Sequence, residues 1–428
     1  MSRWLVVAGV IATAAVARAD GDSLAALLAR TDTVAKEVAK IRGLPLKHAI
    51  PNEVVDRVEL HARLAKLAGD HKTQAELVAE GLSLARWGMI PLGTDYLQLQ
   101  VELMTDQIAG YYDPETKKLT ILQSAGDDPS WAEMVLAHEL DHGLQDQAFD
   151  LHKFEDLPDT EGDAAMARHA LVEGDGIALM IEVLLARAQR PAPWADPAIA
   201  AKFVDLMAAP TGDSLDSAPL AIREAMLFPY RAGFAFVAAL RRRHAWSAID
   251  AAFKRPPRST EQILHPEKYV ADERPIEVVA ESPLPGYAVA SSTVWGELGF
   301  ALFLRAHGVD EQVAAQAAAG WGGDRVIVLA KDGETRPERT VGLARLEWDT
   351  EVDAIEAQQA AVRAVDDAII GAAIEHDDAR TRWLALDGTV AWVERRGNSL
   401  IVAIGVPASA AEAMAADAWT ATKRQAKR

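Results

Sequence analysis

The run His138-Glu139-Leu140-Asp141-His142 restricts the fold of this chain more than any other feature of its sequence. Side chains four residues apart lie on one face of an α-helix, so both imidazoles can reach the same point beside that helix. Glu139 stands one residue further round, where its carboxylate can touch a water at that point. The run therefore predicts a helix that binds a metal ion. Two solvent-facing histidines on a helix surface would have the same spacing, and they are the alternative.

The residues before this run predict the elements that support it. Residues 108–122 are typical of a β-hairpin, because Asp113-Pro114-Glu115-Thr116 separates two runs of aromatic and β-branched residues. A helix is expected over residues 130–147. Ser130 would be its N-cap, with Glu133 three residues on completing a capping box.

A catalytic zinc ion has three protein ligands and one open position, so a third ligand is needed. The strongest candidate is Glu173, downstream of His142 on a second helix expected over residues 160–189. Small glycines follow Glu173 and would let this helix approach another closely. An ordinary carboxylate on a helix surface is the alternative. His169, four residues earlier on the same face, is a rival ligand or a partner of Glu173.

Two segments of the chain carry a resemblance to a known family. Residues 135–147 read Val-Leu-Ala-His-Glu-Leu-Asp-His-Gly-Leu-Gln-Asp-Gln, and residues 170–175 read Ala-Leu-Val-Glu-Gly-Asp. Together they resemble bacterial gluzincin metallopeptidases, the group with a thermolysin-type metal site, and more narrowly uncharacterised secreted members in which Leu-Gln-Asp-Gln extends the motif. The metzincin class is excluded, because Gln145 and Ala148 stand where its glycine and third histidine belong.

The resemblance implies a site and a reaction. It implies that His138, His142 and Glu173 bind one zinc ion, and that Glu139 is the general base of peptide-bond hydrolysis. It also implies that the strand over residues 118–123 is a sheet edge along which an extended peptide substrate pairs.

The sequence departs from thermolysin-like enzymes at one position near the third ligand. Those enzymes place an Asp four residues after the Glu ligand, and this chain has Ile177 there. A carboxylate that orients a ligand must then come from elsewhere, with Asp175 and Asp141 as candidates.

A developing oxyanion needs a hydrogen-bond donor besides the metal. Tyr230 is the first candidate, because gluzincins often place a Tyr at the head of the helix that follows the Glu ligand, here a helix expected over residues 229–242. A tyrosine between aromatic neighbours can equally be a core residue. His265 and Tyr111 are further candidates.

The first nineteen residues have the layout of a secretory signal peptide. A charged start precedes an apolar run over residues 4–17, and Ala17-Arg18-Ala19 forms a small-x-small cleavage site. An apolar run of about fourteen residues is shorter than the ~20 that span a bilayer. We therefore expect export to the periplasm or the extracellular space, with no stable membrane anchor after cleavage.

The composition of the chain limits its possible cross-links, membrane anchors and binding partners. The chain contains no cysteine, so disulfides and a lipid-modified N-terminal cysteine are excluded, and its stability must come from core burial and the metal. A formal net charge of −19 argues against nucleic acid, which requires a cationic surface. A peptide or protein substrate is the expected partner.

The predicted fold class is α+β. After the signal peptide, residues 20–90 are expected to form an N-terminal helical region. Residues 91–285 would be a zincin-like catalytic domain, mostly helical with a small β-sheet. Residues 286–428 would be a C-terminal α+β domain, with helices over residues 294–306 and 351–374 and with strands near residues 324–329, 342–348, 383, 390 and 401.

Three functions remain open from the sequence. A zinc peptidase explains why Glu139 stands beside the ligands, since a structural zinc site does not need a carboxylate that binds no metal. A zinc hydrolase of a non-peptide amide or ester would use the same residues. A secreted binding or assembly protein with a relic zinc site is the third reading, with the C-terminal domain as its functional part.

Overall fold

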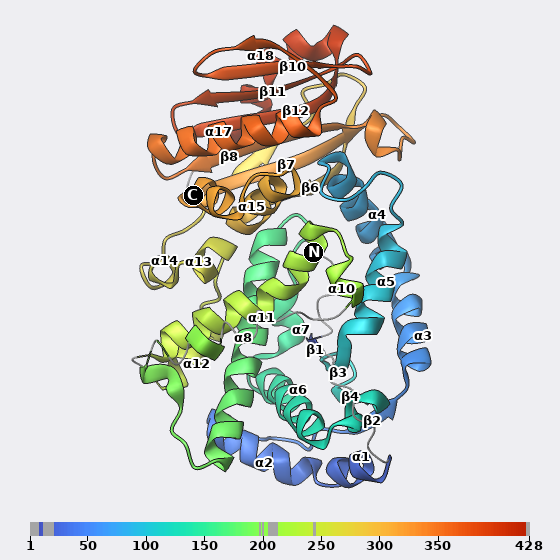
Figure 1. Ribbon diagram of the computed structural model, residues 1–428, viewed down its shortest axis with the longest axis vertical. Coiled ribbons are helices and arrows are strands. Elements are labelled where there is room, and N and C mark those ends of the chain that lie inside the picture. Colours follow the sequence, from blue (N-terminus) through green and yellow to red (C-terminus); the bar gives the residue numbers. More distant parts are fainter. Residues whose placement is uncertain are drawn as a thin grey trace.

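The computed structural model describes residues 8–11, 21–196, 198, 201–203, 213–242 and 245–424. Most of the predicted signal peptide therefore lies outside the described residues. The α+β fold class is confirmed: helices dominate the first part of the chain, and a large antiparallel sheet lies at the C-terminal end (Figure 1). Within the described residues, no helix is both long and apolar enough to cross a membrane.

A small sheet lies beside the predicted metal-binding helix. Its strand order is β1 (Ala8–Ile11), β3 (Ile108–Asp113), β4 (Lys118–Leu122) and β2 (Asn52–Val55). The β3–β4 hairpin has the predicted antiparallel pairing, and β2 joins β4 in parallel. The prediction that residues 118–123 form a sheet edge is wrong, because β4 lies between β3 and β2.

Three long helices form the centre of the molecule: α6 (Pro129–Phe149), α8 (Gly162–Arg187) and α11 (Leu220–Arg241). Helix α6 begins at Pro129, two residues earlier than an N-cap at Ser130 would place its first residue, because Asp128 rather than Ser130 accepts the first backbone N–H groups. Helix α11 starts well before Pro229, which lies inside it. The predicted start at Pro229 is therefore wrong, although proline favours a first helical position.

Helices α8 and α11 approach closely where two glycines meet. A Cβ atom on Gly174 would collide with the backbone of Gly233, and a Cβ atom on Gly233 would collide with the carbonyl of Ala170. Any larger side chain at either position would push the two helices apart, so this contact fixes the depth at which α8 lies in the core.

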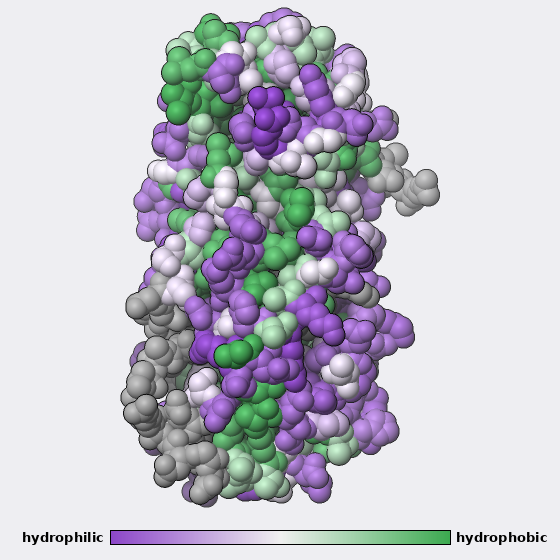
Figure 2. Space-filling model, turned by 90° about the vertical axis from the view of Figure 1, so that its right-hand side faces the viewer, coloured by the Kyte–Doolittle hydropathy of each residue, from purple (hydrophilic) through white to green (hydrophobic). Residues whose placement is uncertain are grey.

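The N-terminal helices divide between two cores. Helices α1 (Gly21–Leu28) and α2 (Thr31–Arg42) share a core with α6 and α8. Helices α3 (Arg57–Ala68), α4 (His71–Arg86) and α5 (Tyr96–Gln107) form a second core against the start of α11. Figure 2 shows the face on this side of the molecule, where hydrophobic side chains are interspersed among hydrophilic ones.

The C-terminal domain is one antiparallel sheet with helices on both faces. Its strand order is β6-β7-β8-β12-β11-β10-β9. Side chains alternate between the faces: Val326 and Val328 contact the core under α15, α16 and α17, while Ile327 and Leu329 contact the core under α18. The elements are β6 (Ala288–Thr293), α15 (Gly296–Ala306), α16 (Glu311–Ala318), β7 (Trp321–Ala330), β8 (Val341–Trp348), α17 (Glu351–Ala368), β9 (Gly371–His376), β10 (Arg380–Ala385), β11 (Thr389–Arg396), β12 (Ser399–Pro407) and α18 (Ala411–Ala421).

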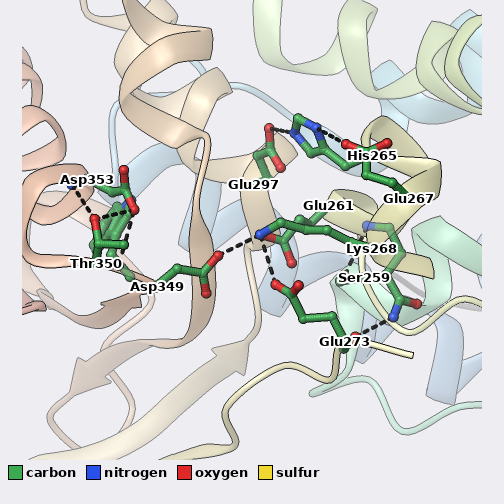
Figure 3. A network of polar contacts seen from close by, with 12 residues as sticks. Ser259, Glu261, His265, Glu267, Lys268, Glu273, Glu297, Asp349, Thr350 and Asp353 are labelled. Carbon is green, nitrogen blue, oxygen red and sulfur yellow. Dashed lines mark hydrogen bonds and ion pairs between the residues drawn. The ribbon is translucent and has the colours of Figure 1, made fainter. Parts of the chain in front are cut away.

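Short elements connect these parts. They are α7 (Leu151–Glu155), α10 (Asp213–Asp216), α12 (Ser247–Lys254), α13 (Thr260–Leu264), α14 (Pro266–Val270), β5 (Val278–Ala280) and β13 (Thr422–Arg424). Figure 3 shows Lys268 of α14 reaching between three carboxylates. Its Nζ lies 2.6 Å from Glu261, 2.9 Å from Glu273 and 2.6 Å from Asp349. Because Asp349 follows β8, this cluster attaches α14 to the C-terminal domain.

Asp324 makes the stability of the C-terminal domain depend on pH. Its buried carboxylate accepts hydrogen bonds from the backbone of Trp295 and Gly296 and from the indole of Trp321, each 2.9 Å long. Burial nevertheless raises the pKa of Asp324 to about 6, above the roughly 3.9 of an unfolded chain. Between these two pKa values the folded state binds the proton more tightly, so stability falls as pH rises through this range.

We predict that the free energy of unfolding of the wild type falls by roughly 3 kcal/mol relative to that of Asp324→Asn as pH rises from about 4 to about 7. Urea unfolding of both proteins across this range measures the difference. Asp417→Asn, an exposed change in the same domain, should keep the pH dependence of the wild type. An Asp324→Asn protein with that same dependence would contradict the assignment.

Candidate metal centre

The structure brings together the three predicted metal ligands. His138 and His142 lie on α6 and Glu173 lies on α8, which packs beside it. The two imidazole Nε2 atoms are 2.9 Å apart. Oε2 of Glu173 lies 3.1 Å from Nε2 of His138 and 3.7 Å from Nε2 of His142.

This geometry suits a zinc ion. Ligand atoms that each lie 2.0–2.2 Å from a tetrahedral ion are about 3.3–3.6 Å from one another, and the three observed distances of 2.9, 3.1 and 3.7 Å span this range. All three side chains are fully buried. A Cβ atom on Gly176 would lie 2.7 Å from the ring of His138, so glycine there leaves room for the imidazole. Nitrogen and carboxylate oxygen donors are those zinc prefers.

The charges in the site favour a bound cation. Burial would raise the pKa of Glu173, but the charge on His142 and hydrogen bonds from both imidazoles hold it well below its usual range. Burial would lower the pKa of His142, but Glu173 and Glu139 outweigh burial and raise it to about 10. Burial and the neighbouring His142 lower the pKa of His138. The carboxylates of Glu173 and Glu139 thus favour positive charge at this position. A divalent ion must compete for it with the proton of His142.

Gln145 fixes the orientation of one ligand. Its Nε2 donates to Asp141 at 2.9 Å and to Asp175 at 3.0 Å, so its Oε1 faces the other way. That oxygen lies 3.0 Å from Nδ1 of His142. The Nδ1–H must therefore donate to Gln145, which leaves Nε2 of His142 free to bind a metal ion.

A buried arginine completes this network. Arg42, at the end of α2, donates to Asp175 through Nε at 2.9 Å and through Nη2 at 3.0 Å. Its Nη1 donates to Asp250 at 2.8 Å, and its guanidinium stacks on Trp246. The expectation that Asp175 or Asp141 orients a ligand is therefore met only indirectly, because Gln145 stands between both carboxylates and His142. The sequence marked Gln145 as a mismatch to metzincins and as part of the Leu-Gln-Asp-Gln extension, but its role in orienting His142 was not predicted.

Glu139, the expected general base, is buried beside the candidate ligands. Its carboxylate is fully buried on α6, one residue after His138, and its charge raises the pKa of the adjacent His142. It is not among the three groups whose donor atoms converge. Glu139 is thus a second carboxylate at the site, separate from the candidate ligand Glu173.

His169 is a neighbour of the ligand set. Its Nδ1 lies 2.9 Å from Glu155 on α7, and its Nε2 lies 3.7 Å from Oε1 of Glu173. It is not in the converging group. Of the two roles expected for His169, the geometry favours a partner of Glu173 over a rival ligand.

Two cavities meet at His169. One, of about 580 Å³, is mainly apolar and includes Tyr230 in its wall. The other, of about 440 Å³, is more polar and runs along β3 and β4 past Tyr111. Both are also lined by Lys72 and Asp159. The three candidate ligands and Glu139 line neither cavity, and His169 is a lining residue that contacts one of these ligands, Glu173.

The candidate oxyanion donors lie in different places. Tyr230 is half-buried on α11 in the wall of the apolar cavity. The hydroxyl of Tyr111 lies 3.5 Å from the guanidinium of Arg63. His265 lies between α13 and α14, with its Nε2 3.0 Å from the carboxylate of Glu297 (Figure 3). Of the three, only Tyr230 shares the apolar cavity with His169.

A second group of carboxylates has a different explanation. Glu261, Glu273 and Asp349 lie close enough to hold a metal ion. The ammonium group of Lys268 already lies among them (Figure 3). An ion pair with a protein cation accounts for this cluster.

Comparisons with known proteins bear only on the C-terminal part of the chain. Residues 285–415 match a domain of unknown function (DUF8575). Neither the curated proteins nor the solved structures include a match. The matched residues contain none of the candidate ligands, so function must be inferred from the side chains of the site.

We predict that Gln145→Leu weakens zinc binding about 10- to 100-fold, because His142 loses the group that orients it. Competition with a chelator of known affinity measures the change. Gln147→Leu on the same helix is the matched control, because its amide contacts the backbone at residues 47 and 48 instead. Equal zinc affinity in the two variants would show that Gln145 does not orient the ligand.

Proposed function

We propose that this protein is a zinc-dependent peptidase, with His138, His142 and Glu173 as ligands and Glu139 as general base. The observation that carries the proposal is the convergence of three donor atoms within 3.7 Å in a buried site. Three protein ligands leave one position for water, as in catalytic zinc sites. A second buried carboxylate beside the ligands has a use in catalysis but none in a purely structural site.

The residues of the chain divide the work of hydrolysis. A zinc ion in this site would supply Lewis acidity toward the attacking water and the scissile carbonyl. Glu139 takes a proton from the water as the water oxygen adds to the carbonyl carbon. It then passes this proton to the amine nitrogen as the C–N bond breaks, and so returns to its carboxylate form. The phenol of Tyr230 is the proposed donor to the oxyanion.

The two cavities that meet at His169 support a peptide substrate. A polar cavity along the hairpin and an apolar cavity under α4 and α5 offer different surroundings for the two sides of a chain. An extended peptide pairs with an open strand edge. Strand β1 pairs with β3 and belongs to residues 1–19, the predicted signal peptide. Its removal on export would open the edge of β3 beside α6.

We place the working protein outside the cytoplasm, in the periplasm or the extracellular space. The features that support this are the charged start, the short apolar run and the cleavage site within residues 1–19. Export would separate a peptidase from the proteins of the cytoplasm. Mass spectrometry of the secreted protein should find Asp20 as its first residue.

Elemental analysis and a cleavage assay on residues 20–428 test the proposed function. We expect one zinc ion per chain in the wild type and in Glu139→Gln. Wild-type cleavage of a mixed peptide library, read by mass spectrometry, should fall about 10²- to 10⁴-fold in Glu139→Gln, because the general base is lost. Glu133→Gln, a partly exposed carboxylate on the same helix, should keep wild-type activity.

The other outcomes separate the remaining functions. Zinc without peptide cleavage, but with hydrolysis of amide or ester compounds, would identify a non-peptide hydrolase. Zinc with neither activity would favour a binding or assembly protein. The absence of zinc from both proteins would contradict the metal centre itself.

A further inference from the structure

The apolar cavity lies between three parts of the molecule. Its walls come from α4 and α5, from α8 and α11, and from β6 and α15 of the C-terminal domain. Leu77, Met104, Met226, Trp295 and Leu298 are among the apolar side chains that line it. At about 580 Å³ it is the size of a small-ligand site. It can therefore accept a bulky apolar group.

One charged side chain in this wall is unusually placed. The side chain of Glu76 is only 8% exposed. Among the described residues, none donates a hydrogen bond to either of its carboxylate oxygens. The nearest cation among these residues is Lys72, whose ammonium group forms an ion pair with Glu76 at 3.6 Å, beyond hydrogen-bond distance and on a side chain that is 62% exposed. A buried carboxylate without a hydrogen-bond donor is costly and calls for a donor from elsewhere.

The neighbours of Glu76 add negative charge and acceptors. Asp159 lines the same cavity, and after burial it is the largest cause of the raised pKa of Glu76. Oε1 of Gln107 is also buried in this wall without a donor from the described residues. A ligand that brings hydrogen-bond donors and positive charge would satisfy these groups together.

One wall of the cavity approaches the metal centre through His169. His169 and Tyr230 line it, and Nε2 of His169 lies 3.7 Å from Glu173. A group held in the cavity can therefore contact His169, which in turn contacts Glu173. Under the proposed function, the cavity would accept a substrate side chain near the metal centre.

We propose that this cavity is a specificity site for a peptide segment with a bulky apolar side chain beside a lysine or arginine, whose cation pairs with Glu76. The apolar walls contact the hydrophobic side chain, and Glu76 with Asp159 selects the positive charge. The inference rests on the proposed peptidase function for its substrate, but its contacts can be tested by binding alone.

Isothermal titration with three short peptides tests the proposal. The probes are acetyl-Leu-Phe-Arg-amide and the same peptide with citrulline or glutamate in place of arginine. Citrulline keeps the shape of arginine and removes its charge. Titrations use residues 20–428 carrying Glu139→Gln, so that the peptides are not consumed. We expect the arginine peptide to bind about tenfold more tightly than the citrulline peptide, and the glutamate peptide to bind most weakly.

Two added substitutions assign the preference to Glu76. Glu76→Gln should bind the arginine and citrulline peptides equally. Glu102→Gln removes an exposed carboxylate on α5 and should keep the preference. Ala225→Leu, which narrows the cavity, should weaken both peptides alike, with its thermal unfolding midpoint checked to show that it folds.

The results distinguish failure of the cavity from failure of the peptidase. Equal binding of the arginine and citrulline peptides to the parent protein, or a preference that survives Glu76→Gln, would overturn the specificity site. Arginine selectivity that depends on Glu76, in a protein whose wild type cleaves no peptide, would uphold the cavity and reject the peptidase. Peptide cleavage by the wild type without arginine selectivity would uphold the peptidase and reject the specificity site.

Discussion

The charged carboxylate of Glu173, buried between helices, is the constraint on which the rest of the structure depends. An unpaired ion in the core would cost several kcal/mol, and two imidazoles from α6 face this carboxylate. They can do so only because glycines let α8 lie close to its neighbours. Gly176 leaves room for the ring of His138, and Gly174 meets Gly233 of α11.

This constraint extends to the start of the chain. Gln145 orients His142, the carboxylates of Asp141 and Asp175 orient Gln145, and Arg42 of α2 balances the charge of Asp175. Arg42 is fully buried, so it cannot leave without stranding those carboxylates. Helix α2 is therefore part of the support of the site, although it precedes the histidines by almost a hundred residues of sequence.

Short-range patterns made part of this structure predictable, and long-range contacts made the rest unpredictable. The spacing of His138 and His142 is a property of one helix, and Glu173 is marked by the glycines at positions 174 and 176 that follow it. The roles of Gln145 and Arg42 depend on which helices pack together. Strand β2 joins β4 from a distant segment, which no local pattern reveals. Helix starts were misplaced where Asp128 competed with Ser130 and where Pro229 proved to be internal.

The C-terminal domain contributes to the site through its contacts with α8. Asp163, near the start of α8, accepts hydrogen bonds from the backbone and hydroxyl of Thr260, and that hydroxyl accepts one from the backbone of Leu298 on α15. Helix α15 then supplies Leu298 to the wall of the apolar cavity. The same helix α8 carries Glu173 ten residues further on. Hydrogen bonds through Thr260 therefore connect the helix that carries Glu173 to a helix that lines the cavity, so a domain that contains none of the candidate ligands still shapes the space near them.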